Sequence, residues 1–184
     1  MPYYTKNGDE GKTTLYKGNE QKFKSSEVFD VLGTLDELNA SLGFQHISHI
    51  KSISRLIIEI QNELFVIGSI IAKDSAEPVN VEYWENKIER MEKEIIFYDK
   101  DLPGLSSFVI PGGTSEAVHL HVSRTIARRL ERRLVSYINS ENKRNYIILE
   151  KYINRLSDLL FVLSRYANNV LNTEEVFVKN ANII

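Results

Sequence analysis

The amino-acid sequence predicts an all-α protein, most simply an up-and-down bundle of five helices. Only four prolines and nine glycines occur among its 184 residues. They cluster near the N-terminus and in one central stretch, so the long segments between the clusters are almost free of helix breakers. Within those segments apolar residues recur at intervals of three and four, which is the period of an amphipathic helix.

The first helix is predicted to begin near Ser25 or Ser26, because a serine side chain can cap a helix N-terminus. A single helical stripe of apolar residues follows, consisting of Val28, Val31, Leu32, Leu35, Leu38 and Leu42.

The other four helices are predicted by the same criteria at 54–72, after Pro78, from Thr114 or Ser115 to 138, and at 146–172. Two segments remain outside helices, 1–24 and 99–114. Because loops on a rigid scaffold are where binding and catalytic residues concentrate, we expect the chemistry there.

Composition sets the class of protein and excludes several functions. Apolar residues make up 42% of the chain and charged residues 26%, with a net charge of −2, as in an ordinary globular domain. We therefore expect one domain over 1–184 and no general nucleic-acid binding, which would require a basic surface. The chain has no cysteine, which excludes disulfides and thiolate metal sites. No apolar run approaches a membrane span and no targeting segment is visible, so a cytoplasmic location is expected.

The segment 5–14 combines glycines, lysines and hydroxyls: Thr5-Lys6-Asn7-Gly8-Asp9-Glu10-Gly11-Lys12-Thr13-Thr14. Convergent backbone N–H groups, a lysine charge and hydroxyls are what a polyphosphate needs. The spacing is not that of a Walker A loop, because position 6 holds lysine where that motif requires glycine. The alternative is a flexible N-terminal tail rich in turn formers.

Three arginines of the fourth predicted helix share one face, since Arg124, Arg128 and Arg132 are spaced by four residues. Like charges in such a row repel unless an anion lies among them, and arginine is suited to bidentate phosphate binding. The alternative is a set of salt bridges to acids on neighbouring helices, such as Asp36, Glu37 or Asp158.

The histidines do not support a metal site. A di-iron carboxylate bundle of ferritin-like shape needs two Glu-x-x-His motifs, and only Glu116 and His119 have that spacing. His121 is expected to be a core histidine. In the central loop, Phe108, Val109 and Ile110 are consecutive apolar residues, either a plug into the core or an apolar wall for a large flat ligand.

Five sequence blocks in order resemble one family, the PduO-type ATP:cob(I)alamin (corrinoid) adenosyltransferases. The blocks are TKNGDEGKTTL at 5–15, GTLDELNASLG at 33–43, FVIPGG at 108–113, RTIARRLERR at 124–133 and NRLSD at 154–158. The resemblance implies a five-helix homotrimer with active sites between adjacent subunits. It also implies transfer of the 5′-deoxyadenosyl group of ATP, with Mg²⁺, to the cobalt of cob(I)alamin, releasing triphosphate.

The resemblance also implies roles for individual residues. The N-terminal segment 1–24 would bind ATP through Thr5, Lys6, Asn7, Gly8, Asp9, Thr13, Thr14 and Lys24. The helical contacts to ATP would come from Arg128, Arg129, Glu131, Arg132 and Asn154. Arg124 would pair with Asp36 across the subunit interface, and Arg128 would act in catalysis as well as binding. Magnesium ligands are not identified by the resemblance.

Phe108 would pack under the corrin ring and exclude the lower axial ligand, which makes reduction of Co(II) to Co(I) easier. The chain departs from the family pattern at Ser25 and Ser26, where acids often follow the lysine matching Lys24, and at Leu32, where tyrosine is usual. One residue also appears inserted between Gly18 and Lys24, so the contact of Lys24 is the detail most affected.

Two other functions remain open from the residues alone. A different ATP-using enzyme, such as a kinase, would release ADP or AMP in place of triphosphate. A non-catalytic helical scaffold or a carrier of adenosylcobalamin would not need a glycine loop and an arginine row together. The partners that the resemblance implies are a corrinoid reductase and an adenosylcobalamin-dependent mutase or dehydratase, with neither nucleic acid nor membrane among them.

Overall fold

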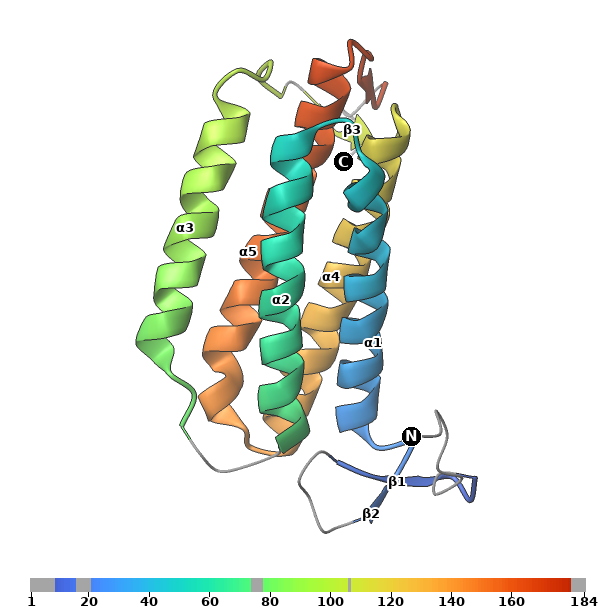
Figure 1. Ribbon diagram of the computed structural model, residues 1–184, viewed down its shortest axis with the longest axis vertical. Helices are drawn as coiled ribbons and strands as arrows, with labels where there is room; N and C mark the ends of the chain where they lie inside the picture. Colours follow the sequence, from blue (N-terminus) through green and yellow to red (C-terminus); the bar gives the residue numbers. More distant parts are fainter. Residues whose placement is uncertain (1–8, 16–20, 74–77, 106, 180–184) are drawn as a thin grey trace.

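A computed structural model of the chain describes residues 9–15, 21–73, 78–105 and 107–179. Its described part contains five α-helices in an up-and-down bundle, which confirms the predicted fold class (Figure 1). The helices are α1 (Glu27–Leu42), α2 (Lys51–Lys73), α3 (Val81–Asp99), α4 (Ser115–Ser140) and α5 (Ile147–Val170). Short 3₁₀ turns at η1 (Gly43–Ile47) and η2 (Arg144–Tyr146) precede α2 and α5.

Side-chain capping marks the start of α4. Thr114 is its N-cap, and the Thr114 hydroxyl accepts a hydrogen bond from the Ala117 N–H at 3.2 Å. Ser26 occupies the N-cap position of α1 without a side-chain capping bond. The predicted start of the second helix at Ser54 is wrong by three residues, because α2 begins at Lys51. The Ser54 hydroxyl instead donates to the Gln45 carbonyl at 2.8 Å and ties α2 to the preceding turn.

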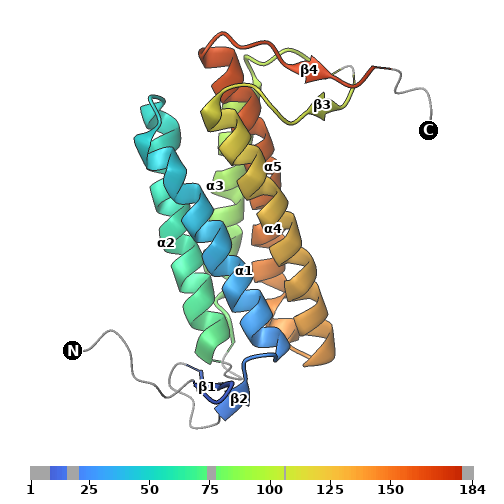
Figure 2. The same cartoon turned by 90° about the vertical axis from the view of Figure 1, so that its right-hand side faces the viewer.

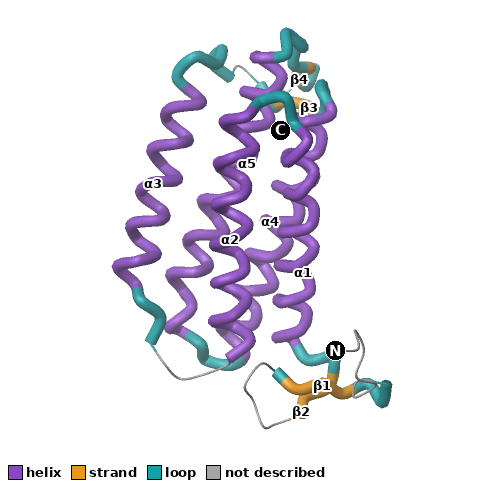
Figure 3. Tube along the Cα trace, viewed as in Figure 1, coloured by secondary structure: helices purple, strands orange, loops and turns teal. Residues whose placement is uncertain are grey.

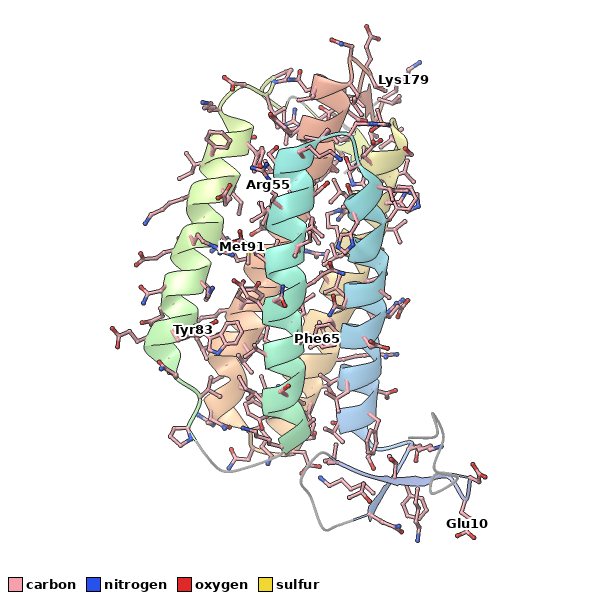
Figure 4. The ribbon with its side chains drawn as sticks, viewed as in Figure 1. Glu10, Arg55, Phe65, Tyr83, Met91 and Lys179 are labelled. Atoms are coloured by element: carbon pink, nitrogen blue, oxygen red, sulfur yellow. The ribbon has the colours of Figure 1, made fainter. Side chains whose placement is uncertain are left out.

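Helices α4 and α5 form the centre of the bundle. Helix α1 packs on α4, α3 packs on α5, and α2 packs on α1 (Figures 1 and 2). The core between them is apolar, and Leu38, Leu64, Leu130 and Leu156 are each 0% exposed. Figure 4 shows Met91 directed from α3 toward the bundle, in agreement with its burial. Burial of the apolar faces of the helices is the main contribution to the stability of the fold, at about 25 cal/mol per Å² of apolar surface removed from water.

Two small antiparallel sheets lie at opposite ends of the bundle (Figure 3). Strands β1 (Lys12–Thr14) and β2 (Gln21–Phe23) pair beside the start of α1, with Thr13 opposite Lys22. Strands β3 (Val109–Ile110) and β4 (Val176–Phe177) pair at the other end, with Val109 opposite Phe177. In Figure 4 the labelled Glu10 and Lys179 mark these two ends.

A buried polar cluster joins α2, α3 and α5 within the otherwise apolar core. The Glu63 carboxylate is 5% exposed and accepts a hydrogen bond from the Tyr152 hydroxyl at 2.6 Å. It also forms ion pairs with Lys87 at 2.8 Å and Arg90 at 3.0 Å. Burial, followed by the charge of Glu63, raises the pKa of Tyr152 well above its usual range. The cluster satisfies the buried carboxylate and holds α3 against the bundle.

No helix among the described residues is both long enough and apolar enough to cross a membrane.

His121 is a core histidine, as the sequence predicts. Its side chain lies between α4 and α5, the residue is 3% exposed, and Nδ1 lies 3.5 Å from the Ser164 hydroxyl. Its Nε2 has no hydrogen-bond partner in the described structure. Burial and the nearby Arg124 charge lower the pKa of His121 to about 4.

We predict that His121 makes the protein less stable in mild acid. The unfolded chain takes up a proton near the ordinary histidine pKa of about 6.5, whereas the folded chain does so only near 4. Stability is therefore lost as the pH falls between these values, by about 2–3 kcal/mol from pH 7.5 to 4.5. Urea denaturation of the wild type and of His121→Leu at pH 7.5 and 4.5 measures this change in the free energy of unfolding. An equal pH dependence in both proteins would contradict the prediction.

Candidate functional site

The described part of the N-terminal loop is an ordered pair of strands. Gly11 has a positive φ of 75°, which a residue with a side chain rarely adopts, and its carbonyl accepts a hydrogen bond from the Lys24 N–H at 2.9 Å. This bond brings Lys24 beside the glycine turn, while Asp9 and Thr14 are exposed next to it. The predicted ATP residues Thr5, Lys6, Asn7 and Gly8 lie outside the described residues.

The arginine row lies along the outer side of α4, beside α5. Arg124 is half-buried, with its guanidinium 6.0 Å from the centre of the Phe161 ring and its Nε without a hydrogen-bond partner in the described structure. Burial, followed by the charge of Arg128, lowers the pKa of Arg124. Arg128 and Arg132 are exposed. The row therefore offers positive charge to any anion that approaches this face.

The alternative of internal salt bridges is wrong for this row within the described residues. Glu37 pairs with Arg129 at 2.5 Å, and Asp158 pairs with Arg155 at 2.8 Å. Asp36 is exposed on α1 and forms no ion pair with any of the three arginines of the row in the described part of the chain. Three like charges without a counter-charge are unfavourable by a few tenths of a kcal/mol per pair, so an external anion would stabilise them.

Two of the other predicted ATP residues lie together between α4 and α5. The Asn154 side-chain amide donates to the Glu131 carboxylate at 2.7 Å. Asn154 also lines a cleft of about 520 Å³ between α3 and α5, which Glu92 and Arg155 border. Burial, followed by the charge of Glu131, raises the pKa of Glu150 beside this cleft. Arg129 points toward α1 in its pair with Glu37 and does not join these residues.

Phe108 directly precedes β3, and β3 lies at the end of the bundle opposite the N-terminal strands (Figures 1 and 2). Phe108 is 71% exposed, so the interpretation of this loop as a plug into the core is wrong. Ile110, two residues further on, is 46% exposed, so this segment presents two large apolar side chains to solvent in one chain. The 26 residues of α4 separate the two ends by about 39 Å at 1.5 Å per residue.

Three polar residues that hold the Phe108 loop have no signal in the sequence motifs. Arg165, Asn168 and Glu175 are buried or half-buried. Arg165 and Asn168 bond the loop to the C-terminal end of α5, and Glu175 bonds Arg165 from the C-terminal segment. Helical spacing alone places polar residues of α5 on a face, but it does not say which distant segment they contact. The sequence does show an arginine, Arg165, next to the apolar stripe of the fifth helix, and a charged residue there indicates a buried polar partner.

The described residues contain no group of three or more His, Asp or Glu side chains arranged to hold a metal ion. A Mg²⁺ that arrives with a nucleotide is bound chiefly by phosphate oxygens and water, and needs few protein ligands. The hydroxyls of Thr13 and Thr14 on β1 are oxygen donors of the type that such an ion accepts.

The sequence model of the cobalamin adenosyltransferase family matches residues 3–167. The chain is 38% identical over 168 residues to the corrinoid adenosyltransferase PduO of Salmonella typhimurium, and the match covers 90% of this chain and 49% of that protein. It is 35% identical over 173 residues to the corrinoid adenosyltransferase of Bacillus subtilis, covering 91% of this chain and 87% of that protein. The chain therefore spans about half of the first relative and most of the second.

Solved structures agree with the sequence matches. A variant PduO-type ATP:corrinoid adenosyltransferase from Lactobacillus reuteri, complexed with cobalamin and ATP, superposes with a TM-score of 0.86 at 32% identity, covering 97% of this chain and 100% of that one. A second variant of that type, complexed with ATP, gives a TM-score of 0.83 at 33% identity, covering 96% and 99%. With the family match spanning residues 3–167 and the fold alike over nearly the whole chain, this protein belongs to the cobalamin adenosyltransferase family.

Proposed function

We propose that this chain transfers the 5′-deoxyadenosyl group of ATP to the cobalt of cob(I)alamin, giving adenosylcobalamin and triphosphate. The observation that carries the proposal is the row of Arg124, Arg128 and Arg132 on α4, which lacks a counter-charge among the described residues. The row belongs to a fold that is matched over 97% of the chain by a corrinoid adenosyltransferase complexed with cobalamin and ATP.

The reaction is an alkyl transfer with triphosphate as the leaving group. Co(I) attacks C5′ of the ribose, the Co–C bond forms, and the bond from C5′ to the triphosphate oxygen breaks with its electron pair leaving on oxygen. Negative charge therefore grows on the triphosphate, and Arg128 and Arg132 would stabilise it. Each charge-assisted hydrogen bond contributes about 1.5–3 kcal/mol. Mg²⁺ would neutralise further charge on the same phosphates.

The remaining ATP contacts are proposed from the family resemblance and from the positions of the residues. Asn154 and Glu131 would orient the nucleotide from the junction of α4 and α5, where they are already hydrogen-bonded to each other. The N-terminal segment would close over the phosphates through Thr5, Lys6, Asn7, Gly8, Asp9, Thr13, Thr14 and Lys24. Arg129 pairs with Glu37 in the single chain, so it would have to break this ion pair before it could bind ATP.

We infer that the active site lies between subunits of a homotrimer. Within one chain the N-terminal strands and Phe108 lie at opposite ends of the bundle, and Asp36 and Arg124 do not pair. A carboxylate and a guanidinium on neighbouring helices that have no ion-pair partner among the described residues are suited to bridging two copies of the chain. The Asp36–Arg124 pair would then order the corrinoid side of the site.

Phe108 would act on the corrinoid. Exposed in the single chain, its ring is free to pack under the corrin and exclude the lower axial ligand. Loss of an axial donor lowers the energy of the orbital that accepts the electron, so Co(II) is reduced to Co(I) more easily. A corrinoid reductase would supply that electron, and an adenosylcobalamin-dependent mutase or dehydratase would receive the product. We propose that these steps take place in the cytoplasm.

An anaerobic assay tests the reaction directly. The protein is mixed with chemically reduced cob(I)alamin, Mg²⁺ and ATP, and the corrinoid spectrum and the phosphate products are followed. We expect adenosylcobalamin and triphosphate in equal amounts. Release of ADP or AMP would indicate a kinase-like enzyme, and ATP binding without any change in the corrinoid would indicate a carrier.

We predict that Phe108→Ala keeps the ATP affinity within about twofold but lowers turnover by about tenfold or more when cob(II)alamin must be reduced during the assay. The loss should be smaller with cob(I)alamin prepared in advance, because the side chain acts on the reduction step. Ile110→Ala, which removes an exposed apolar side chain from the adjoining strand β3, is the matched control. Unchanged turnover of Phe108→Ala with cob(II)alamin would rule out this role.

The homotrimer is tested by charge reversal. Asp36→Arg and Arg124→Asp should each lower the mass in sedimentation from three times the chain mass of 21.2 kDa toward one, because each creates a like-charge contact between copies. The double variant should recover the trimer. Glu37→Arg is the control, since Glu37 pairs with Arg129 inside the chain. A trimer that persists in both single variants would remove this pair from the interface.

A further inference from the structure

Two side chains on one face of α5 hold both ends of the loop that carries Phe108. Arg165 and Asn168 are three residues apart, so they are neighbours on the helix surface. They are 3% and 2% exposed. The loop runs from the end of α3 at Asp99 to the start of α4 at Ser115, and it reaches α5 at both of its ends.

Arg165 binds the first part of the loop and the C-terminal segment together. Its Nε donates to both carboxylate oxygens of Glu175 at 3.1 Å, and its Nη2 donates to Glu175 at 3.0 Å. Nη2 also donates to the Pro103 carbonyl at 2.7 Å, and Nη1 lies 3.9 Å from the Asp99 carboxylate. One buried guanidinium thus connects α5, on which it lies, to the end of α3, to the loop and to the segment before β4.

Asn168 binds the last part of the loop. Its side-chain carbonyl accepts hydrogen bonds from the Thr114 N–H at 2.9 Å and the Thr114 hydroxyl at 3.2 Å, while its amide donates to the Gly112 carbonyl at 3.1 Å. Gly113 has a φ of 103°, and a Cβ at that position would overlap the Asn168 side chain. The close approach between loop and helix therefore requires glycine.

The arginine contact extends to Phe108 through the small sheet. Glu175 immediately precedes β4, and Phe108 immediately precedes β3. The Val178 N–H donates to the Phe108 carbonyl at 2.8 Å, and the Ser107 hydroxyl donates to the Val178 carbonyl at 3.1 Å. A continuous series of contacts therefore runs from Arg165 through Glu175 and β4 to Val178, which directly follows β4 and bonds the Phe108 backbone.

Two of the large apolar side chains in this loop are exposed. Leu105 is 51% exposed and Phe108 is 71% exposed. A cleft of about 550 Å³ separates the loop from the C-terminal segment, and Leu102, Arg165, Glu175 and Phe177 are among the residues that border it. Leu102 packs against the core at the start of the loop, and from Pro103 onward the contacts to α5 are the polar bonds of Arg165 and Asn168.

We propose that Arg165 and Glu175 are positioning residues for the reaction, which hold the C-terminal strand β4 against β3 and so set the position of Phe108 at the corrinoid. The inference rests on the proposed function for its consequence in catalysis. Its structural half, that the pair fixes the Phe108 backbone through β4, is measured without any substrate.

The test compares Glu175→Ala with Glu63→Gln, a change at a buried carboxylate that binds Arg90 and Tyr152 far from the loop. Amide hydrogen exchange tests the structural claim, that the pair fixes the Phe108 backbone through β4. Glu175→Ala should increase exchange at Val178 and across 107–110 by at least about tenfold, whereas Glu63→Gln should leave these amides unchanged. Unchanged exchange at Val178 in Glu175→Ala would overturn the proposal.

The catalytic consequence of the pair is measured from the spectrum of the bound corrinoid in the presence of ATP and from steady-state kinetics. Glu175→Ala should lower the fraction of bound cob(II)alamin without a lower axial ligand and reduce kcat by about tenfold, with the KM for ATP changed less than about twofold. Glu63→Gln should leave both the spectrum and kcat unchanged. Glu175→Gln, which keeps hydrogen-bond acceptance, should recover part of the loss.

A double-mutant cycle separates positioning from general loss of stability. If Glu175 acts through Phe108, adding Glu175→Ala to Phe108→Ala should lower kcat by less than about twofold more. Fully multiplicative losses would overturn the proposal. A wild type that leaves the corrinoid unchanged would refute the proposed function instead, and the exchange experiment would still decide whether the Arg165–Glu175 pair holds the strand.

Discussion

Burial of α5 is the constraint on which the rest of the structure depends. This helix lies between α3 and α4, and residues such as Ile153, Leu156, Leu160 and Leu163 are 0% exposed. Because a helix buried on so many sides loses most of its contact with water, its apolar side chains supply much of the driving force for folding. Each polar side chain that α5 carries inward must then find a partner within the protein.

Those partners give the bundle its specific arrangement. Tyr152 reaches Glu63 and so connects α5 to α2 and α3, while Asn154 reaches Glu131 on α4. Arg165 and Asn168 reach the loop and the C-terminal segment. Burial would hold the helices together in several registers, but hydrogen bonds of fixed geometry favour one of them. The same central helix therefore supports the fold and both ends of the candidate site.

The arginines of α4 fall into two groups, one paired with acids of α1 and one facing away from them. Arg129 and Arg133 face α1 and are neutralised by Glu37 and Asp30, although Arg133 lies 3.9 Å from its acid. Arg124, Arg128 and Arg132 turn away from these acids. A single chain thus separates arginines that stabilise the bundle from arginines that remain available to an anion, and the helical period alone produces the separation.

The sequence by itself determined the five helices and the arginine row, because helical period is a local property. It narrowed the starts of α1 and α4 to two neighbouring residues each, and the structure places the N-caps at Ser26 and Thr114. Its ordered motifs also indicated the family. Only the tertiary structure decided that Arg129 pairs with Glu37, that Phe108 is exposed at the end opposite the N-terminal strands, and that Arg165 holds Glu175. Such contacts join segments far apart in the chain, and no local pattern encodes which partner a buried polar group will meet.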